Sequence, residues 1–359
     1  MKAYYLVFAL TLLISLFYNA RTDVGWKRKL FWTFLPLFVF GAIRVDFGLD
    51  YSAYEKVFDK VHSHGSFFVD HDAHEEIGYQ LLNWIMPTYR SLLVLTAFML
   101  SLSLAVFCYH NIPKKYLWLA IILIFLNPEK NIYGILVSMR TGICVSSFLL
   151  GYVFVQKRKW LPFFLMVIAM MFIHTSSVVF MTIAYLLGSN KPFGKKDVWV
   201  WIGAIVVLLF LSTTQLFNVV AVLIDNDIMN RYEEVLSATS SHRGILQSIT
   251  CVIIIVLLIV YFRTNSESLT PADNSLLRMG MLFAASLLLG SLSMRAAFFY
   301  DVFFIGSVVK VASDKKAAIA LRLSLVAIAI ASSCYSMYHV WMGAPWWNHA
   351  IYHSLLGNW

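Results

Sequence analysis

An unusual polar stretch follows the second apolar run of this sequence. Residues 44–54 read R-V-D-F-G-L-D-Y-S-A-Y and place three charged side chains, one glycine and two tyrosines directly after a hydrophobic segment. The chain as a whole is 60% hydrophobic and only 13% charged, so such a cluster at the edge of a membrane segment is uncommon for it. We interpret the stretch as one wall of an active site that faces away from the cytoplasm.

Four cationic or titratable side chains are expected at one depth. Arg44, Arg140, His174 and Arg295 each lie about 14–17 residues, roughly 21–26 Å of helix, from the inner membrane face. Any one arginine alone is explained by a side chain that reaches the outer interface. Together they favour a cavity that holds an anion, because a guanidinium grips phosphate oxygens with two parallel hydrogen bonds. In the outer leaflet, that anion is most simply a lipid-linked phosphate or pyrophosphate.

Membrane helices must position these side chains. The mean hydropathy is +0.73 and apolar runs recur along all 359 residues, so we expect an all-α polytopic membrane protein with a single domain, 1–359. Residues 160–187 are too long for one span and carry basic clusters at both ends. We therefore expect a break near His174, with two short arms that rise and return. The count is then about twelve helical membrane segments. The apolar runs lie at about 3–20, 30–43, 91–108, 116–127, 134–155, 160–187, 198–217, 244–262, 276–294, 296–312 and 317–337.

The basic residues indicate topology. Most Lys and Arg residues form short clusters between apolar runs, and the positive-inside rule then places both termini outside. The expected outer parts are the loops at about 44–90 and 218–243 and the tail 338–359. The first loop ends in an amphipathic piece, 79–86, which predicts an interfacial helix stopped by Pro87. Because the net charge of +9 is dispersed in this way, we expect the lipid bilayer and no nucleic acid as a partner.

No cofactor or metal site is predicted. The four cysteines lie singly in separate apolar segments, without metal or redox spacing. Two D-x-D triplets occur, at 70–72 and 225–227, but both are expected outside, whereas the nucleotide-sugar donors that such triplets bind are cytoplasmic. The histidines of the first loop match no firm metal template, although a site there is conceivable beside the simpler reading of a solvated polar loop.

Five short motifs occur in order along the chain: R-V-D-F-G-L-D-Y-S-A-Y (44–54), E-E-I-G-Y (75–79), M-R-T-G-I (139–143), F-I-H-T-S-S (172–177) and R-A-A-F-F-Y-D (295–301). With the helix layout, this set resembles the EpsG family of bacterial polysaccharide-synthesis membrane proteins, which are related in function to Wzy-type polymerases. The resemblance implies polymerisation of oligosaccharide repeat units carried on undecaprenyl pyrophosphate, at the outer face of the cytoplasmic (inner) membrane. Exopolysaccharide, capsule and O-antigen are products of this class. A chain-length regulator and other polysaccharide-assembly proteins are the protein partners such a role implies.

Residue roles follow from this reaction. Joining two units breaks the bond between an anomeric carbon and the lipid pyrophosphate, so negative charge grows on the leaving group and fixed cations stabilise the transition state. We assign the pyrophosphate to Arg140 and Arg295, with Arg44 or Arg231 as a third member. The attacking sugar hydroxyl needs a base, for which the candidates are Asp50 and His174.

Further residues are assigned to the sugars, and two assignments have structural alternatives. Glu76 fits either a sugar contact or a charge at the N-terminus of the amphipathic helix. His174 fits either the base or a buried histidine that satisfies the backbone of a broken helix. The expected sugar contacts are Tyr51, Tyr54, Glu76 and Tyr300.

Three other classes of protein stay open. A flippase for the same lipid-linked glycan also needs intramembrane arginines, but along a path open to both faces, whereas these lie in one outer layer. A ligase resembling O-antigen ligases grips the same donor as a polymerase. A membrane acyltransferase is the third alternative.

Overall fold

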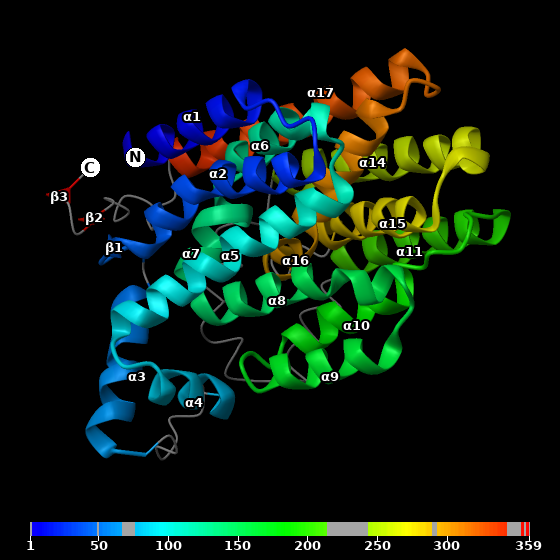
Figure 1. Cartoon of the computed structure of the whole chain (residues 1–359). Coiled ribbons are helices and arrows are strands. Elements are labelled where there is room, and N and C mark those ends of the chain that lie inside the picture. The colour runs from blue at the N-terminus through cyan, green and yellow to red at the C-terminus, as the bar shows by residue number, and fades with distance from the viewer. Residues whose placement is uncertain are drawn as a thin grey trace. The chain divides into compact units, whose positions relative to one another are not determined.

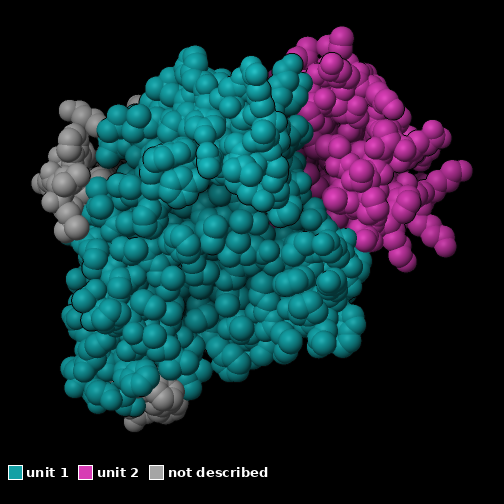
Figure 2. Space-filling view, in the orientation of Figure 1, with its two compact units in different colours: residues 1–186, 329–359 teal, residues 187–328 magenta. Residues whose placement is uncertain are grey.

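The structure is a computed structural model that describes residues 2–48, 50–66, 76–213, 243–288, 293–342, 353–354 and 357–358. The described part is almost entirely helical, as Figure 1 shows, and the predicted all-α class is confirmed. The chain forms two compact units, shown in Figure 2, and each is described by itself. Unit 1 comprises residues 1–186 and 329–359, and unit 2 comprises residues 187–328. The single domain expected from the sequence stays an expectation.

Unit 1 holds the helices of the N-terminal half of the chain. Helix α2 packs against α1 and α5, α5 packs against α8, and α8 packs against α9. Fully buried Leu92, Leu100 and Phe148 form part of the core between them. The helices are α1 (Lys2–Phe17), α2 (Asp23–Ala42), α3 (Tyr51–His64), α4 (Ile77–Ile85), α5 (Tyr89–Asn111), α6 (Leu117–Leu126), α7 (Gly134–Val137), α8 (Met139–Gln156), α9 (Trp160–Met171) and α10 (Ser177–Leu187), with short turns η1 (Lys114–Tyr116) and η2 (Glu129–Tyr133).

The predicted break near His174 is confirmed. Helix α9 ends at Met171 and α10 begins at Ser177. The rings of Phe163 and Tyr185 stack with centroids 4.9 Å apart, and the Arg158 guanidinium donates to the carbonyl of Tyr185. Because residues of the chain before His174 contact a residue after it in this way, the two helices fold back on each other as a hairpin (Figure 1).

A small antiparallel sheet joins the residues that follow α2 to the C-terminal tail. Strand β1 (Arg44–Val45) pairs with β2 (His353–Ser354), which pairs with β3 (Gly357–Asn358). In this register, Arg44 lies opposite Ser354. The two segments that the sequence places outside therefore lie on the same side of the protein.

Unit 2 contains a buried arginine, Arg278, that links α15 to the start of α11 and to the segment before it. The Arg278 guanidinium lies 3.0 Å from Oδ1 of Asp197 and donates to the carbonyls of Ser189 and Lys191, both at 2.7 Å. Helix α15 packs against α14 and α16. The elements are α11 (Lys195–Thr213), α14 (Arg243–Asn265), η3 (Ser266–Ser268), α15 (Pro271–Ser286), α16 (Ser293–Ser313) and α17 (Ile319–Met342), whose residues from Ala329 on belong to unit 1.

The number of membrane spans differs from the predicted segment count. Within the described residues, four helices are long and apolar enough to cross a membrane, and a fifth span results if two helices joined at a 90° bend count as one. The four are Tyr89–Asn111, Met139–Gln156, Ser248–Ser268 and Ala296–Ser313, and the bent pair is Lys114–Leu126 with Lys130–Val137. Other apolar helices, including α9 and α10, are too short to span alone. The expected twelve segments are therefore not established.

Two local predictions are corrected by the structure. The apolar run 134–155 is not one helix, because it breaks at Ser138, where the backbone leaves the helical region between α7 and α8. Residues 51–64, expected as loop, form α3, whose buried residues Tyr51, Tyr54, Phe58 and Val61 follow helical spacing. The helix expected at 79–86 is found as α4, and its position at the membrane interface stays a prediction.

Candidate active site

Residues on both sides of α3 pack against the junction between α7 and α8. Gly48 has a φ of +88°, and a Cβ there would lie 2.3 Å from Cγ2 of Val137, so both the backbone angle and the close approach require glycine. The contacts follow the order of both segments. The pairs are Arg44 with Leu136, Gly48 with Val137, Asp50 with Ser138 and Glu76 with Arg140. This junction brings three of the five motifs together.

Arg44 is buried in this junction, with 1% of its surface exposed. Its Nη1 donates to the carbonyl of Gly41 at 2.6 Å, and its Nη2 donates to Thr96 Oγ1 at 3.1 Å and the carbonyl of Leu136 at 3.2 Å. A buried guanidinium that donates to three elements stabilises their packing. The geometry favours a structural role, and the pyrophosphate role of Arg44 stays a prediction.

The carboxylate of Glu76 is the centre of the site. Its Oε2 forms an ion pair with Nη1 of Arg140, and its Oε1 lies 3.2 Å from Nδ1 of His174 and 3.2 Å from the backbone nitrogen of Thr175. The side chains of Glu76, Arg140 and His174 are 19%, 25% and 13% exposed. The structure therefore joins three predicted site residues in one partly open cluster.

The cluster keeps the Glu76 carboxylate ionised. Burial by itself raises the pKa of this carboxyl group, but the hydrogen bond from His174 and the charge of Arg140 outweigh burial and lower the pKa from 4.5 to about 2. Although Glu76 occupies the N-cap position of α4, its side chain makes no capping hydrogen bond. The carboxylate serves the cluster and not the helix end.

The hydrogen bonds define the orientation of the His174 ring. An ionised carboxylate only accepts hydrogen bonds, so the ring donates to Glu76 through Nδ1. In the neutral ring, Nε2 is then the acceptor, and it lies 2.8 Å from Oγ of Ser176. Sequence reasoning gave Ser176 no role, although its spacing of two residues from His174 is visible in the F-I-H-T-S-S motif.

Helix α4 reaches the hairpin through a glycine. The backbone nitrogen of Gly78 donates to the carbonyl of Phe172 at 2.8 Å, and a Cβ at this position would lie 2.6 Å from that oxygen. Only glycine allows this approach without displacement of one backbone. The glycine of the E-E-I-G-Y motif thus holds the start of α4 against the turn that carries His174.

Helix α4 buries its polar side and exposes its apolar side. Gln80 and Asn83 are fully buried, whereas Trp84 is 47% and Ile85 is 58% exposed. An amphipathic helix in water does the reverse. Exposed apolar side chains of this kind are expected where a helix borders lipid. The site residue Glu76 thus begins a helix whose outer face suits a bilayer.

The tyrosines lie beside the cluster. The guanidinium of Arg140 lies 5.8 Å from the ring centroid of Tyr54 and 5.9 Å from that of Tyr79. Tyr51 packs edge-on against Tyr89, whose hydroxyl donates to the carbonyl of Tyr51 at 3.0 Å. Tyr51 and Tyr54 are each only 8% exposed. The sugar contacts predicted for both stay predictions. The ring of Tyr54 lies beside the Arg140 guanidinium.

The remaining predicted site residues lie in unit 2 or outside the described residues. Tyr300 lies in α16 of unit 2 and is 2% exposed. Arg295 lies in the first turn of α16, and its side chain is outside the described residues. Arg231 and both D-x-D triplets also lie outside the described residues. Their roles stay predictions.

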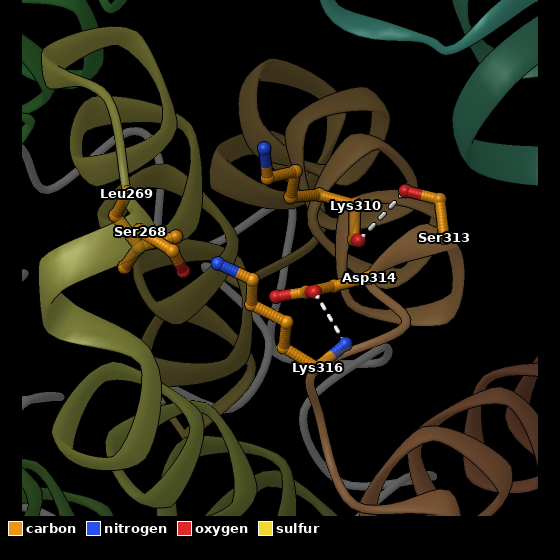
Figure 3. Close-up of a pocket in the computed structure, with 6 residues that line it drawn as sticks. All are labelled: Ser268, Leu269, Lys310, Ser313, Asp314 and Lys316. Atoms are coloured by element: carbon orange, nitrogen blue, oxygen red, sulfur yellow. Dashed lines mark hydrogen bonds between the residues drawn. The ribbon is translucent and has the colours of Figure 1, made fainter.

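Unit 2 contains a polar pocket with a volume of about 300 Å³. Figure 3 shows Lys316 extending toward Ser268, and Ser313 bonding the carbonyl of Lys310 at 2.9 Å. The backbone nitrogen of Lys316 donates to Asp314 at 2.9 Å. The lining is Ser268, Leu269, Lys310, Ser313, Asp314 and Lys316, which includes no predicted site residue.

The part of the chain that the structure describes contains no group of three or more His, Cys, Asp or Glu side chains placed to hold a metal. Most of the histidine-rich loop, including His71 and His74, lies outside that part. The cluster of Glu76, Arg140 and His174 instead combines one cation, one carboxylate and one imidazole. Such a set can stabilise an anion and accept a proton.

Comparison with protein families matches residues 27–353 to the model of the EpsG family. The match covers all five motifs and nearly the whole chain. No curated protein and no solved structure matches the chain.

Proposed function

Because the chain belongs to the EpsG family, a family of Wzy-like polysaccharide polymerases, we propose that it polymerises oligosaccharide repeat units carried on undecaprenyl pyrophosphate. The reaction takes place at the outer face of the bacterial cytoplasmic membrane. The observation that carries the proposal is the cluster in which Glu76 contacts both Arg140 and His174. It supplies side by side the two functions that this glycosyl transfer needs.

The first function is stabilisation of the leaving pyrophosphate. Arg140 lies at the start of α8, with a quarter of its side chain exposed, and Glu76 fixes its position. A guanidinium has five N–H donors in a rigid fork and can hold two anions at once. In the proposed reaction, Arg140 binds the pyrophosphate while its ion pair with Glu76 fixes the orientation of the guanidinium. Arg295 remains the proposed second member of this clamp, with Arg44 or Arg231 as a third.

The second function is deprotonation of the attacking sugar hydroxyl. Glu76 orients the His174 ring through Nδ1, which leaves Nε2 as the basic nitrogen. A carboxylate in this position also stabilises the imidazolium that forms when the ring takes a proton. Asp50, the other candidate base, accepts a hydrogen bond from Ser138 at 3.3 Å. The oriented ring favours His174 as the base.

The placement of α4 supports a lipid-linked donor. The helix exposes Trp84 and Ile85 on its outer side, and its first turn begins beside the Glu76 carboxylate. A polyprenyl chain in the outer leaflet can therefore stay in lipid while its pyrophosphate reaches Arg140. This arrangement suits a substrate that has both an apolar tail and an anionic headgroup.

The test uses the purified protein in liposomes, supplied with lipid-linked repeat units. The expected result is a ladder of longer lipid-linked glycans, released pyrophosphoryl-lipid, and no dependence on added metal or nucleotide. Transfer of single units across the bilayer without a ladder would identify a flippase. Transfer of the glycan only to an added unrelated acceptor would identify a ligase, and either result contradicts the proposal.

A further inference from the structure

A hydroxyl group completes a hydrogen-bonded chain at the site. Glu76 Oε1 lies 3.2 Å from His174 Nδ1, and His174 Nε2 lies 2.8 Å from Ser176 Oγ. The three groups thus form a carboxylate–imidazole–hydroxyl sequence, in which each nitrogen of the ring has one of the other two groups as its partner. Such a sequence moves a proton from the hydroxyl to the ring without any change of side-chain position.

The position of Ser176 at the start of α10 makes its contact with His174 unusual. Ser176 directly precedes α10, at the position where a serine ordinarily accepts a hydrogen bond from the backbone of the first helical turn. In the described structure, its hydroxyl instead contacts the imidazole of His174. Ser176 is partly exposed, so an incoming hydroxyl can reach it. The ring nitrogen that serves as base is therefore covered by a group that itself carries a proton.

We propose that Ser176 is a catalytic relay residue, which takes the proton of the acceptor sugar hydroxyl as it passes its own proton to His174. This inference rests on the proposed polymerase function and deepens it. Glu76 is the positioning residue of the relay, because it contacts the ring and not the substrate.

The relay balances in one concerted step. The acceptor oxygen forms a bond to the anomeric carbon, and its proton moves to Ser176 Oγ. The original hydroxyl proton of Ser176 moves to Nε2 of His174, which becomes an imidazolium paired with the Glu76 carboxylate. The bond between the anomeric carbon and the pyrophosphate oxygen breaks, and the leaving pyrophosphate takes the electron pair beside Arg140. The imidazolium then returns its proton to solvent.

The experiment compares three variants of the full chain under single-turnover conditions with lipid-linked repeat units. Ser176→Ala should lower the rate of glycosidic bond formation about 100-fold or more with unchanged KM, because a proton-transfer group contributes on that scale. Ser176→Thr keeps the hydroxyl and should retain most of the activity. Thr175→Ala removes an adjacent, exposed hydroxyl and should leave activity unchanged, since Thr175 contacts Glu76 through its backbone.

The number of protons that move in the rate-limiting transition state distinguishes a relay from a structural role of Ser176. The wild-type rate in mixtures of light and heavy water should fall along a curve that reflects two moving protons, and the residual rate of Ser176→Ala should fall along a straight line. Should the alanine variant lose its native melting transition, Ser176→Gly provides a second deletion of the hydroxyl.

Three results would overturn the relay. The first is full activity of Ser176→Ala beside a normal wild-type ladder, which leaves the polymerase function intact. The second is a linear heavy-water response of the wild type. The third is covalent labelling of Ser176 by a fluorophosphonate or by the sugar, which makes the serine a nucleophile. If the wild type itself forms no ladder, the proposed function fails and the relay fails with it.

Discussion

His174 Nδ1 lies 3.2 Å from Glu76 Oε1, although 98 residues separate the two in the sequence. The other oxygen of the same carboxylate holds Arg140. One residue at the start of the short helix α4 therefore contacts both the imidazole and the cation. Loss of Glu76 should disturb proton transfer and anion binding together.

Arg140→Lys should lose most of the polymerising activity although the positive charge is kept. A lysine cannot reproduce the planar fork that holds a carboxylate and a phosphate together. We expect a barrier higher by on the order of 3 kcal/mol, a few-hundred-fold in kcat, measured in the ladder assay on folded protein.

Arg90→Lys is the matched control. Arg90 donates to the backbone carbonyls of Ala42 and Arg44, and a lysine can still reach one of them. It should retain near-normal activity. Equal activity of the Arg140 and Arg90 variants would show that the bidentate grip is not used.

Glu76 should make the stability of the protein depend on acidic pH. Its pKa is about 2 in the folded state against 4.5 as the ordinary value, so its contribution is present above about pH 4.5 and is lost as pH falls toward 2. The contribution is on the order of 3 kcal/mol at neutral pH. Melting temperatures in detergent from pH 3 to 7 measure it.

Glu76→Gln should remove this part of the pH dependence and lower the melting temperature at neutral pH. Asp59→Asn, at an exposed carboxylate of α3, serves as the control and should keep the parent profile. A Glu76→Gln profile that parallels the parent over the whole range argues against the paired carboxylate.

Gly78→Ala should loosen α4 from the turn at His174. The added Cβ would meet the carbonyl of Phe172 at 2.6 Å, so one backbone segment has to move. We expect a loss of stability of about 1–3 kcal/mol, the usual scale for overpacking, and reduced activity. Gly203→Ala is the control, because a Cβ there meets nothing within 4 Å. A Gly78→Ala protein with parent stability and activity would exclude close docking.

The sequence could predict the parts of the fold that depend on local pattern. Basic clusters at both ends of 160–187 require the chain to return, and the break between α9 and α10 falls at the expected residues. The helical spacing of Tyr51, Tyr54, Phe58 and Val61 also predicts α3, but the polar residues between them favoured a loop. Local pattern alone did not reveal the break at Ser138, where Gly48 and Asp50, distant in the sequence, pack against the chain.

Sequence reasoning named Glu76, Arg140 and His174 as candidates, but it gave Ser176 no role and did not predict the contacts among them. Depth along the helices placed Arg44, Arg140 and His174 in one layer. Depth does not give direction, and Arg44 turns to the carbonyls of Gly41 and Leu136. The partnership of Glu76 with both Arg140 and His174 joins three distant segments, and no local spacing encodes it.

The expected topology places α3 outside and the segment after α14 in the cytoplasm. A cysteine at exposed Ser63, on a background without the native cysteines, should react with an impermeant reagent added to intact cells. A cysteine at exposed Ser266 should react only after the membrane is permeabilised. The reverse pattern would place the candidate site on the cytoplasmic side and contradict the lipid-linked reaction at the outer face.

The most direct test of the account is the activity of His174→Gln with purified lipid-linked repeat units, assayed from about pH 5 to 9. Wild-type activity should fall toward acidic pH, because a protonated ring accepts no proton. His174→Gln should be nearly inactive across the range while its amount and melting temperature match the parent, since glutamine still donates and accepts hydrogen bonds at the helix break. An active variant with a flat pH profile would contradict the account, move the base to Asp50 and leave His174 as a structural residue.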